Sequence, residues 1–158
     1  MKKLNRKGFT LVELLAVIII LAIVVGITIP AVLGTINNSK NGAMDVAVEA
    51  AQTWLEEQAL VYNTDTNSVD ATFTGDLVKV ADIAGSNAIT LSTDQIKAIG
   101  LKNADVTTVT VTPKGNGKAC VEITKIPTSS QYYNTKYWNS DGTPKTGDNA
   151  PKNKSSHC

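Results

Sequence analysis

One carboxylate stands at the start of a long apolar run, and it is the residue of this chain with the clearest chemical consequence. Glu13 is followed by Leu14–Ile29, a segment without any charged residue. A carboxylate near the centre of a lipid bilayer costs roughly 3 kcal/mol on insertion scales. Such a residue is expected to have a cationic partner and a function. The sequence therefore predicts an acidic site within a membrane segment.

The positive charge of the chain is concentrated at its N-terminus. The first eight residues carry four of the 15 lysines and arginines and none of the 14 acidic residues, which leaves 11 basic against 14 acidic residues, a net charge of −3, in the remainder. Basic residues beside an apolar segment mark the cytoplasmic side of a membrane. We expect the N-terminus in the cytoplasm and the bulk of the chain outside. No basic stripe of the kind that binds nucleic acid is present in the sequence.

A single long helix is expected from Phe9 to about Tyr62, and it has two halves. Residues 9–33 are apolar all round, as a helix in lipid requires, whereas residues 34–62 are amphipathic. About 54 helical residues would span roughly 80 Å, far more than a 30 Å hydrocarbon core, so half of the helix must lie outside lipid. Pro30 predicts a kink. The apolar stripe of the second half is expected to comprise Ala43, Ala47, Ala50, Trp54 and Val61, with Gln58 as its polar member.

Two polar stretches lie on either side of the expected sheet. Residues 63–104 form a connector with two short helical candidates, one from Asp76 to Ile83 and one from Ser92 to Ile99, which Gly100 stops. Residues 139–158 are rich in glycine, proline, asparagine, lysine and serine, and a C-terminal loop is expected there.

An antiparallel sheet is expected over residues 105–138. A β-branched run at Val106–Val111 leads to turn-forming residues at Pro113–Gly117, and Ala119–Ile126 then pairs back. A third strand is expected at the aromatic residues, which pack on the helix or alternatively form an adhesive surface: Tyr132, Tyr133, Tyr137 and Trp138. The predicted fold class is α+β, a long N-terminal helix packed on a small antiparallel sheet.

Few of the remaining residues are candidates for chemistry. Cys120 and Cys158 are too few for a zinc site. In an exported chain they are expected to form one disulfide, which closes a loop of about 39 residues and stabilises the folded chain by roughly 3–4 kcal/mol. The alternative is two unrelated thiols. His157 is the only histidine, and a solvated side chain is expected there. The sequence holds no nucleotide-binding glycine pattern and no catalytic triad, so we expect no cofactor, no metal and no enzymatic activity.

The residues around Glu13 resemble the processing motif of type IV pilins and pseudopilins. Gly8-Phe9-Thr10-Leu11-Val12-Glu13 follows a short basic leader, and Pro30 falls where pilin helices usually carry a proline. The resemblance implies that residues 1–8 are a leader, that a prepilin peptidase cuts between Gly8 and Phe9, and that it methylates the new amine of Phe9. It also implies the type IV pilin fold, with a globular head at residues 34–158.

The resemblance further implies what the motif is for. The charged amine of Phe9 and the carboxylate of Glu13 of a neighbouring subunit neutralise each other, and Phe9, Glu13 and Pro30 are thus the expected assembly residues. The product is a homopolymer, with other pilin subunits, a membrane platform protein and an assembly ATPase as partners. The subunit is expected in the cytoplasmic membrane before assembly and in an extracellular filament afterwards, where it serves adhesion, twitching motility or aggregation.

Other interpretations of the N-terminus remain open. A cleaved secretory signal peptide fits poorly, because Ile29–Gly34 is a weak cleavage site and the apolar run is long. Within the family, the alternative is a pseudopilin of a type II secretion or DNA-uptake system. Outside it, the alternative is a monomeric adhesin or sensor domain held by a signal anchor. The cysteine pair favours a pilin, because the main secretion pseudopilin usually holds its C-terminal region with calcium.

Overall fold

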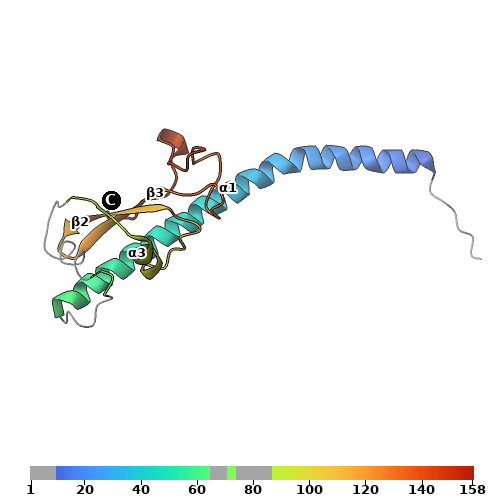
Figure 1. Cartoon of the computed structure of the whole chain (residues 1–158). Coiled ribbons are helices and arrows are strands. Elements are labelled where there is room, and N and C mark those ends of the chain that lie inside the picture. The colour runs from blue at the N-terminus through green and yellow to red at the C-terminus, as the bar shows by residue number, and fades with distance from the viewer. Residues whose placement is uncertain (1–9, 65–70, 74–86) are drawn as a thin grey trace, which may run out of the picture. The chain divides into compact units, whose positions relative to one another are not determined.

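The computed structural model describes residues 10–64, 71–73 and 87–158, and Figure 1 shows its elements. In chain order these are α1 (Leu11–Thr64), β1 (Ile89–Thr90), α3 (Thr93–Ala98), β2 (Thr108–Gly115), β3 (Lys118–Lys125) and the 3-10 turn η1 (Gly147–Asn149). The chain divides into two compact units, residues 1–36 and residues 37–158. Helix α1 belongs to both units. The expected helix from Asp76 to Ile83 lies outside the described residues.

In the first unit, α1 is an isolated apolar helix. Its large apolar side chains are between 45% exposed, at Ile36, and 81% exposed, at Leu11. Pro30 lies inside the helix, which continues on both sides of it. The hydroxyls of Thr28 and Thr35 donate to the backbone oxygens of Val25 and Ala31. A helix whose polar groups bond within the helix can lie in lipid.

In the second unit, α1 packs on the sheet through a stripe that is shifted from the predicted one. The buried members recur at helical spacing: Met44, Val48, Ala51, Gln52, Leu55 and Ala59. Of the predicted stripe, Ala43 and Ala50 are exposed, while Ala47, Trp54 and Val61 lie partly buried at the margin of the core. The predicted stripe was therefore wrong by one residue along the helix. Met44 and Val48 carry more apolar area than the adjacent Ala43 and Ala47, so burying their face is more favourable.

The sheet is antiparallel with the strand order β1-β2-β3. Val109 faces Ile123 and Val111 faces Val121 across the central pair, and all four side chains are buried. The predicted hairpin is confirmed, but its turn is shorter than expected because Pro113, Lys114 and Gly115 belong to β2. Only the two residues between the strands turn the chain: Asn116 with φ 52° and Gly117 with φ 71°. Positive φ at both positions is the two-residue hairpin turn that Asn-Gly favours.

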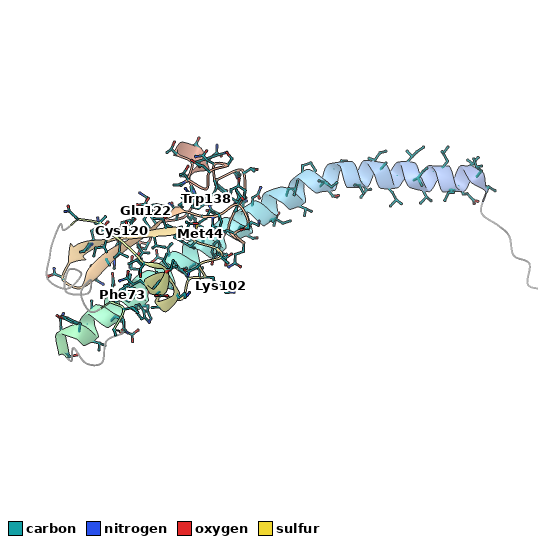
Figure 2. All side chains as sticks on the ribbon, viewed as in Figure 1. Met44, Phe73, Lys102, Cys120, Glu122 and Trp138 are labelled. Carbon is teal, nitrogen blue, oxygen red and sulfur yellow. A yellow bond between two sulfur atoms is a disulfide. The ribbon has the colours of Figure 1, made fainter. Side chains whose placement is uncertain are left out.

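The third strand lies elsewhere than expected. It is β1 at Ile89–Thr90, within the predicted connector, and it pairs with β2. The aromatic segment at residues 132–138 instead forms turns, because Asn134 Oδ1 accepts from the Tyr137 N–H at 3.0 Å and Asn134 O accepts from the Trp138 N–H at 3.0 Å. Trp138 and Phe73, both labelled in Figure 2, are among the largest fully buried side chains.

The second predicted helix is confirmed as α3. Ser92 is its N-cap, and the hydroxyl of Ser92 accepts from the Gln95 N–H while the Gln95 side chain accepts from the Ser92 N–H. This reciprocal capping box satisfies two backbone donors that a helix start leaves unpaired. Gly100, with φ 83°, follows the helix as expected.

Candidate functional site

The carboxylate of Glu13 lies at the N-terminal end of α1, where it caps the helix. Glu13 Oε2 accepts from the Thr10 N–H at 2.9 Å and from the Thr10 hydroxyl at 2.8 Å. In return the Glu13 N–H donates to Thr10 Oγ1 at 3.3 Å. This is a capping box, for which the pattern Thr-x-x-Glu is the sequence signal. Sequence reasoning missed this second role of Glu13, although the pattern was visible.

Apolar side chains continue from Glu13 along the first unit. Leu14–Ile29 contains no charge, and its large apolar side chains are 49% to 72% exposed. Helix α1 is long and apolar enough in this half to cross a membrane. Exposed apolar patches of such extent mark a contact with lipid or with protein. Glu13 lies at the N-terminal end of this exposed apolar surface.

The structure describes only some of the other predicted processing and assembly residues. Gly8 and Phe9, the expected cleavage and methylation positions, lie outside the described residues. Pro30 lies within α1, and a side chain added at Gly26 or Gly34 would meet nothing within 4 Å. This half of the helix therefore presents an open surface on which a neighbour could pack.

A disulfide joins Cys120 of β3 to Cys158, as the sequence predicted. The Cα atoms of the two residues are 4.6 Å apart, within the usual range for a disulfide. Cys120 is 6% exposed, while Cys158 lies at the surface. In the chain-entropy model, closing a loop of this length stabilises the fold by roughly 3–4 kcal/mol.

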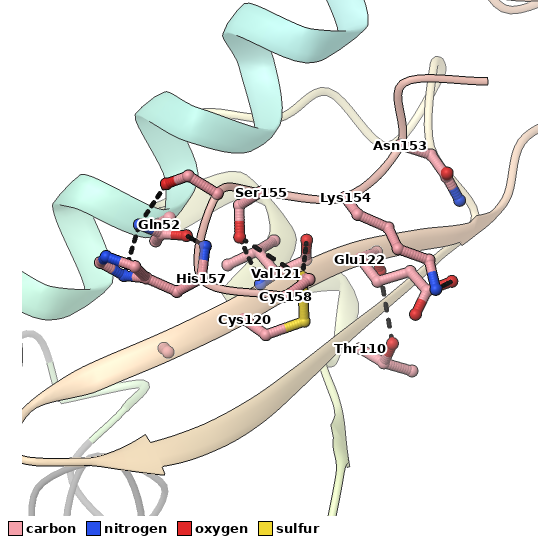
Figure 3. The surroundings of a disulfide bond; sticks show 12 residues. Gln52, Thr110, Cys120, Val121, Glu122, Asn153, Lys154, Ser155, His157 and Cys158 are labelled. Atoms are coloured by element: carbon pink, nitrogen blue, oxygen red, sulfur yellow. Dashed lines mark hydrogen bonds and ion pairs between the residues drawn. A yellow bond between two sulfur atoms is a disulfide. The ribbon is translucent and has the colours of Figure 1, made fainter.

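The disulfide is one of several attachments of residues 153–158, hereafter the C-terminal segment. The segment lies along β3, as Figure 3 shows. The Ile123 N–H donates to Asn153 O at 2.8 Å, and the Ser155 N–H donates to Val121 O at 2.9 Å. Two side chains complete the pairing: the Asn153 amide donates to Ile123 O at 2.7 Å, and Ser155 Oγ accepts from the Val121 N–H at 2.8 Å. The expected C-terminal loop is therefore held by backbone and side-chain bonds to β3 as well as by the disulfide.

His157 lies against α1 instead of being solvated as expected. Its Nδ1 is 2.5 Å from Glu56 Oε1, and because a carboxylate only accepts, the ring nitrogen donates. Glu56 also accepts from the Ala119 N–H at 3.1 Å and from Lys118 Nζ at 3.2 Å. Burial alone would raise the pKa of Glu56, but these three bonds outweigh burial and hold the pKa below its ordinary value of 4.5. Glu56 thus joins α1, β3 and the C-terminal segment.

The aromatic residues contribute to packing on α1. Tyr137 and Trp138 are buried, at 8% and 2% exposure, and the Tyr137 hydroxyl donates to Asn38 Oδ1 at 2.9 Å. Tyr132 and Tyr133 are partly buried against the same core. Burial, with the nearby charge of Asp105 as a smaller cause, raises the pKa of Tyr132 above its ordinary value. These contacts support the packing interpretation over the adhesive one.

Comparison with known families identifies the N-terminus. Residues 3–29 match the model of the prokaryotic N-terminal methylation motif, the leader signature of type IV prepilins. The match covers the basic leader, the positions Gly8 and Phe9, the acidic position Glu13 and the apolar segment up to Ile29. No curated protein and no solved structure matches the chain. The signature is that of a structural, pilin-type precursor.

Proposed function

We propose that this chain, which carries the type IV prepilin leader signature, is the structural subunit of a type IV pilus. Prepilin peptidase cuts between Gly8 and Phe9 and methylates the amine of Phe9. The mature subunit then polymerises through the apolar half of α1 into a surface filament for adhesion, motility or aggregation. The observation that carries the proposal is the match of the leader signature to the residues that lead into a wholly exposed apolar helix.

The exposed apolar helix supports a membrane stage followed by a filament stage. Before assembly, Leu14–Ile29 lies in the cytoplasmic membrane with the leader on the cytoplasmic side, as the basic residues indicate. After assembly, the same surface packs against other copies, which bury it again. Because the segment leaves lipid and not water, the stabilisation on assembly comes mainly from close packing between the helices. The subunit therefore exchanges one apolar environment for another.

The capping box suggests how Glu13 serves both stages. Both bonds from Thr10 end on Oε2 of Glu13, which leaves Oε1 to accept a further donor. After cleavage, the methylated amine of Phe9 in a neighbouring subunit supplies that donor and a compensating charge. Pairing the two charges removes the cost of keeping either of them alone in an apolar interior. Glu13 thus caps the N-terminus of its own helix and sets the position of the neighbouring subunit. Pro30 belongs to the same packing surface.

The partners follow from this cycle. They are the prepilin peptidase, other pilin subunits, a membrane platform protein and an assembly ATPase that acts from the cytoplasm. The finished filament lies outside the cell. Nothing in the cycle requires the subunit itself to catalyse a reaction or to bind nucleic acid.

A pseudopilin of a secretion or DNA-uptake system is the second candidate, because the leader signature is compatible with both. The disulfide between Cys120 and Cys158 supports the pilin, since it closes the C-terminal region covalently. Purifying filaments from sheared cells distinguishes the two candidates. Long surface fibres rich in this chain are expected for a pilin. Fibres that form only when the secretion or uptake system is overproduced would favour the pseudopilin.

The processing step is tested by the intact mass and N-terminal sequence of the exported protein. The mature chain is expected to begin at Phe9, to carry one additional methyl group and to be two hydrogens lighter than its reduced form. An N-terminus at Met1, or one beyond residue 30, would overturn the processing proposal.

The assembly step is tested by Glu13→Leu, with Glu57→Leu as the matched control. Glu57 is an exposed glutamate on the same helix, in the second unit. We expect Glu13→Leu to remain membrane-inserted but to form no fibres, whereas Glu57→Leu assembles. Normal fibre yield from Glu13→Leu would show that assembly does not need this carboxylate, whereas absence of fibres from the unmodified chain as well would support a membrane-anchored monomer domain.

A further inference from the structure

The sequence contains two Asn-Gly pairs, and the structure places them in opposite environments. Asn41-Gly42 lies inside α1, whereas Asn116-Gly117 forms the turn between β2 and β3. In such a pair the backbone nitrogen of the glycine approaches the side-chain carbonyl carbon of the asparagine most easily, because glycine has no side chain in the way. The two pairs are alike in an unfolded chain, so the folded environment decides which of them reacts.

The pair in α1 is held by hydrogen bonds. Within an α-helix each backbone N–H donates to the carbonyl oxygen four residues earlier, which engages the nitrogen of Gly42. Asn41 Oδ1 accepts from the Lys152 N–H at 2.7 Å, and this bond fixes the side chain. A reaction here requires α1 to unwind next to Met44, which is 1% exposed in the core. Core helices open only at a free energy close to that of global unfolding.

The pair in the hairpin turn is open to solvent. Asn116 is exposed, and among the residues that the structure describes its side chain has no hydrogen-bond partner. Nothing in the described ranges accepts from the Gly117 N–H either. Both residues line a surface hollow of about 510 Å³, together with Leu60 near the end of α1. Water and hydroxide therefore reach the amide of Asn116 and the nitrogen of Gly117.

The strand ladder holds this end of the hairpin loosely. Gly115 opposite Lys118 is the last pair before the turn, and the register shifts between Pro113 and Gly115. Proline has no backbone N–H, so Pro113 donates no bond to the ladder. Exposed segments with few ladder bonds open at a small fraction of the free energy of unfolding. Such opening lets a peptide unit of the turn rotate and brings the nitrogen of Gly117 to Asn116 Cγ.

We propose that Asn116-Gly117 is a site of spontaneous chemical modification, at which the side-chain amide of Asn116 becomes a carboxyl group. In the opened turn, hydroxide takes the proton of the Gly117 N–H, and this nitrogen attacks Asn116 Cγ. A bond forms between these two atoms, and the side-chain nitrogen takes a proton from water and leaves as ammonia. Water then cleaves the resulting succinimide ring at either carbonyl carbon, which yields aspartate or isoaspartate at position 116. One water is consumed, one ammonia is released, and no oxidant or reductant takes part.

The isoaspartate product weakens the contact between α1 and β3. It inserts one extra backbone carbon into the two-residue turn, so Gly115 and Lys118 no longer lie opposite each other. Lys118 Nζ and the Ala119 N–H, which follow the turn directly, both donate to Glu56, at 3.2 Å and 3.1 Å. The modified chain is therefore less stable than the new one. This inference goes beyond the filament function and does not depend on the leader or on Glu13.

The relative rates at the two Asn-Gly pairs test the proposal. The full-length chain is incubated in detergent in a mildly alkaline buffer made with 18O-labelled water, then digested in ordinary water and examined by mass spectrometry. We expect the peptide with Asn116 to exchange an NH group for 18O more than about tenfold faster than the peptide with Asn41. The reduced chain in denaturant is the control, and both peptides should convert there at comparable rates. Conversion of Asn116 in the folded chain that is no faster than conversion of Asn41 would overturn the proposal.

A variant that cannot react identifies the position. Asn116→Gly keeps the turn, because glycine adopts positive φ at both turn positions, but it has no side-chain amide. Asn41→Gln is the matched control, since it keeps an amide at the helical position. After equal incubation, isoaspartate is measured by labelling with an isoaspartate methyltransferase. We expect wild type and Asn41→Gln to gain the same label and Asn116→Gly to gain much less. Equal labelling of Asn116→Gly and wild type would place the reaction elsewhere and overturn the proposal.

Thermal unfolding of the same samples tests the structural consequence. The Tm of wild type should fall during incubation in step with its isoaspartate content, whereas the Tm of Asn116→Gly should stay constant. A constant Tm in wild type that has gained isoaspartate would show that the turn does not support the bonds to Glu56.

Discussion

Glu56→Gln should destabilise the second unit in a pH-dependent way. Glu56 is 16% exposed at its side chain and accepts from the Ala119 N–H, Lys118 and His157. Glutamine keeps the bond to the Ala119 N–H but loses the negative charge. Bonds to charged groups contribute about 1.5–3 kcal/mol when shielded, and the pair with Lys118, whose side chain is 54% exposed, contributes at most about 1 kcal/mol. We expect a loss of about 2 kcal/mol at pH 7.

The pH dependence follows from the direction of the pKa shift. The pKa of Glu56 is lower in the folded chain than in the unfolded chain, so the stabilisation by its charge is fully present above pH 4.5 and is lost as the pH falls through the folded pKa. The difference between wild type and Glu56→Gln should therefore be constant near neutral pH and should shrink in acid.

Thermal unfolding of the full chain in detergent, followed by circular dichroism, measures this effect. For a domain of this size, about 2 kcal/mol corresponds to a lowering of the Tm by roughly 6–10 °C at pH 7. Glu57→Gln, at the exposed neighbouring position, is the matched control and should change the Tm by less than about 2 °C. A Tm loss that is the same at pH 3 and at pH 7, or that is equal in the two variants, would refute the reasoning.

Three further substitutions test other parts of the second unit by the same unfolding assay. Gly142→Ala should cost more than about 3 kcal/mol, because φ is +80° and a Cβ would lie 1.9 Å from the backbone oxygen of Ile126; a loss under 1 kcal/mol would contradict this. Leu55→Ala should cost about 2–5 kcal/mol through the cavity it leaves, whereas Leu60→Ala, at a position 67% exposed, should cost under 1 kcal/mol; equal losses would place the core elsewhere. Ser92→Ala should cost about 1 kcal/mol through loss of the α3 cap, and Ser92→Asp should restore most of it.

Features fixed by neighbouring residues could be predicted from the sequence. The hairpin follows from Asn116-Gly117, since few other pairs adopt two positive φ values. Helix α3 follows from Ser92 and the Gln95 that completes its capping box. The apolar half of α1 follows from composition alone. In each case the cause lies within a few residues of its effect.

Features fixed by distant parts of the chain could not be predicted in the same way. β1 consists of two residues and exists because β2 offers it an edge. The buried face of α1 was displaced by one residue because Met44 and Val48, and not the smaller Ala43 and Ala47, fill the space over the sheet. His157 carried no local signal, because its partner Glu56 lies 101 residues earlier. The capping role of Glu13 is different, since Thr10 three residues before it was a usable sign.

The spacing between Glu56 and His157 has a consequence for the order in which the chain folds. Contacts between residues about 100 positions apart close late, because long loops must first be brought together at an entropic cost. Until residues 153–158 arrive, Glu56 lacks one of its three partners and the edge of β3 lies bare. Until these residues dock, the folding chain is therefore an incomplete intermediate with an open sheet edge, and such intermediates are prone to aggregate. The slowest step in maturation would be the docking of its final few residues, with thiol oxidation as the event that makes it permanent.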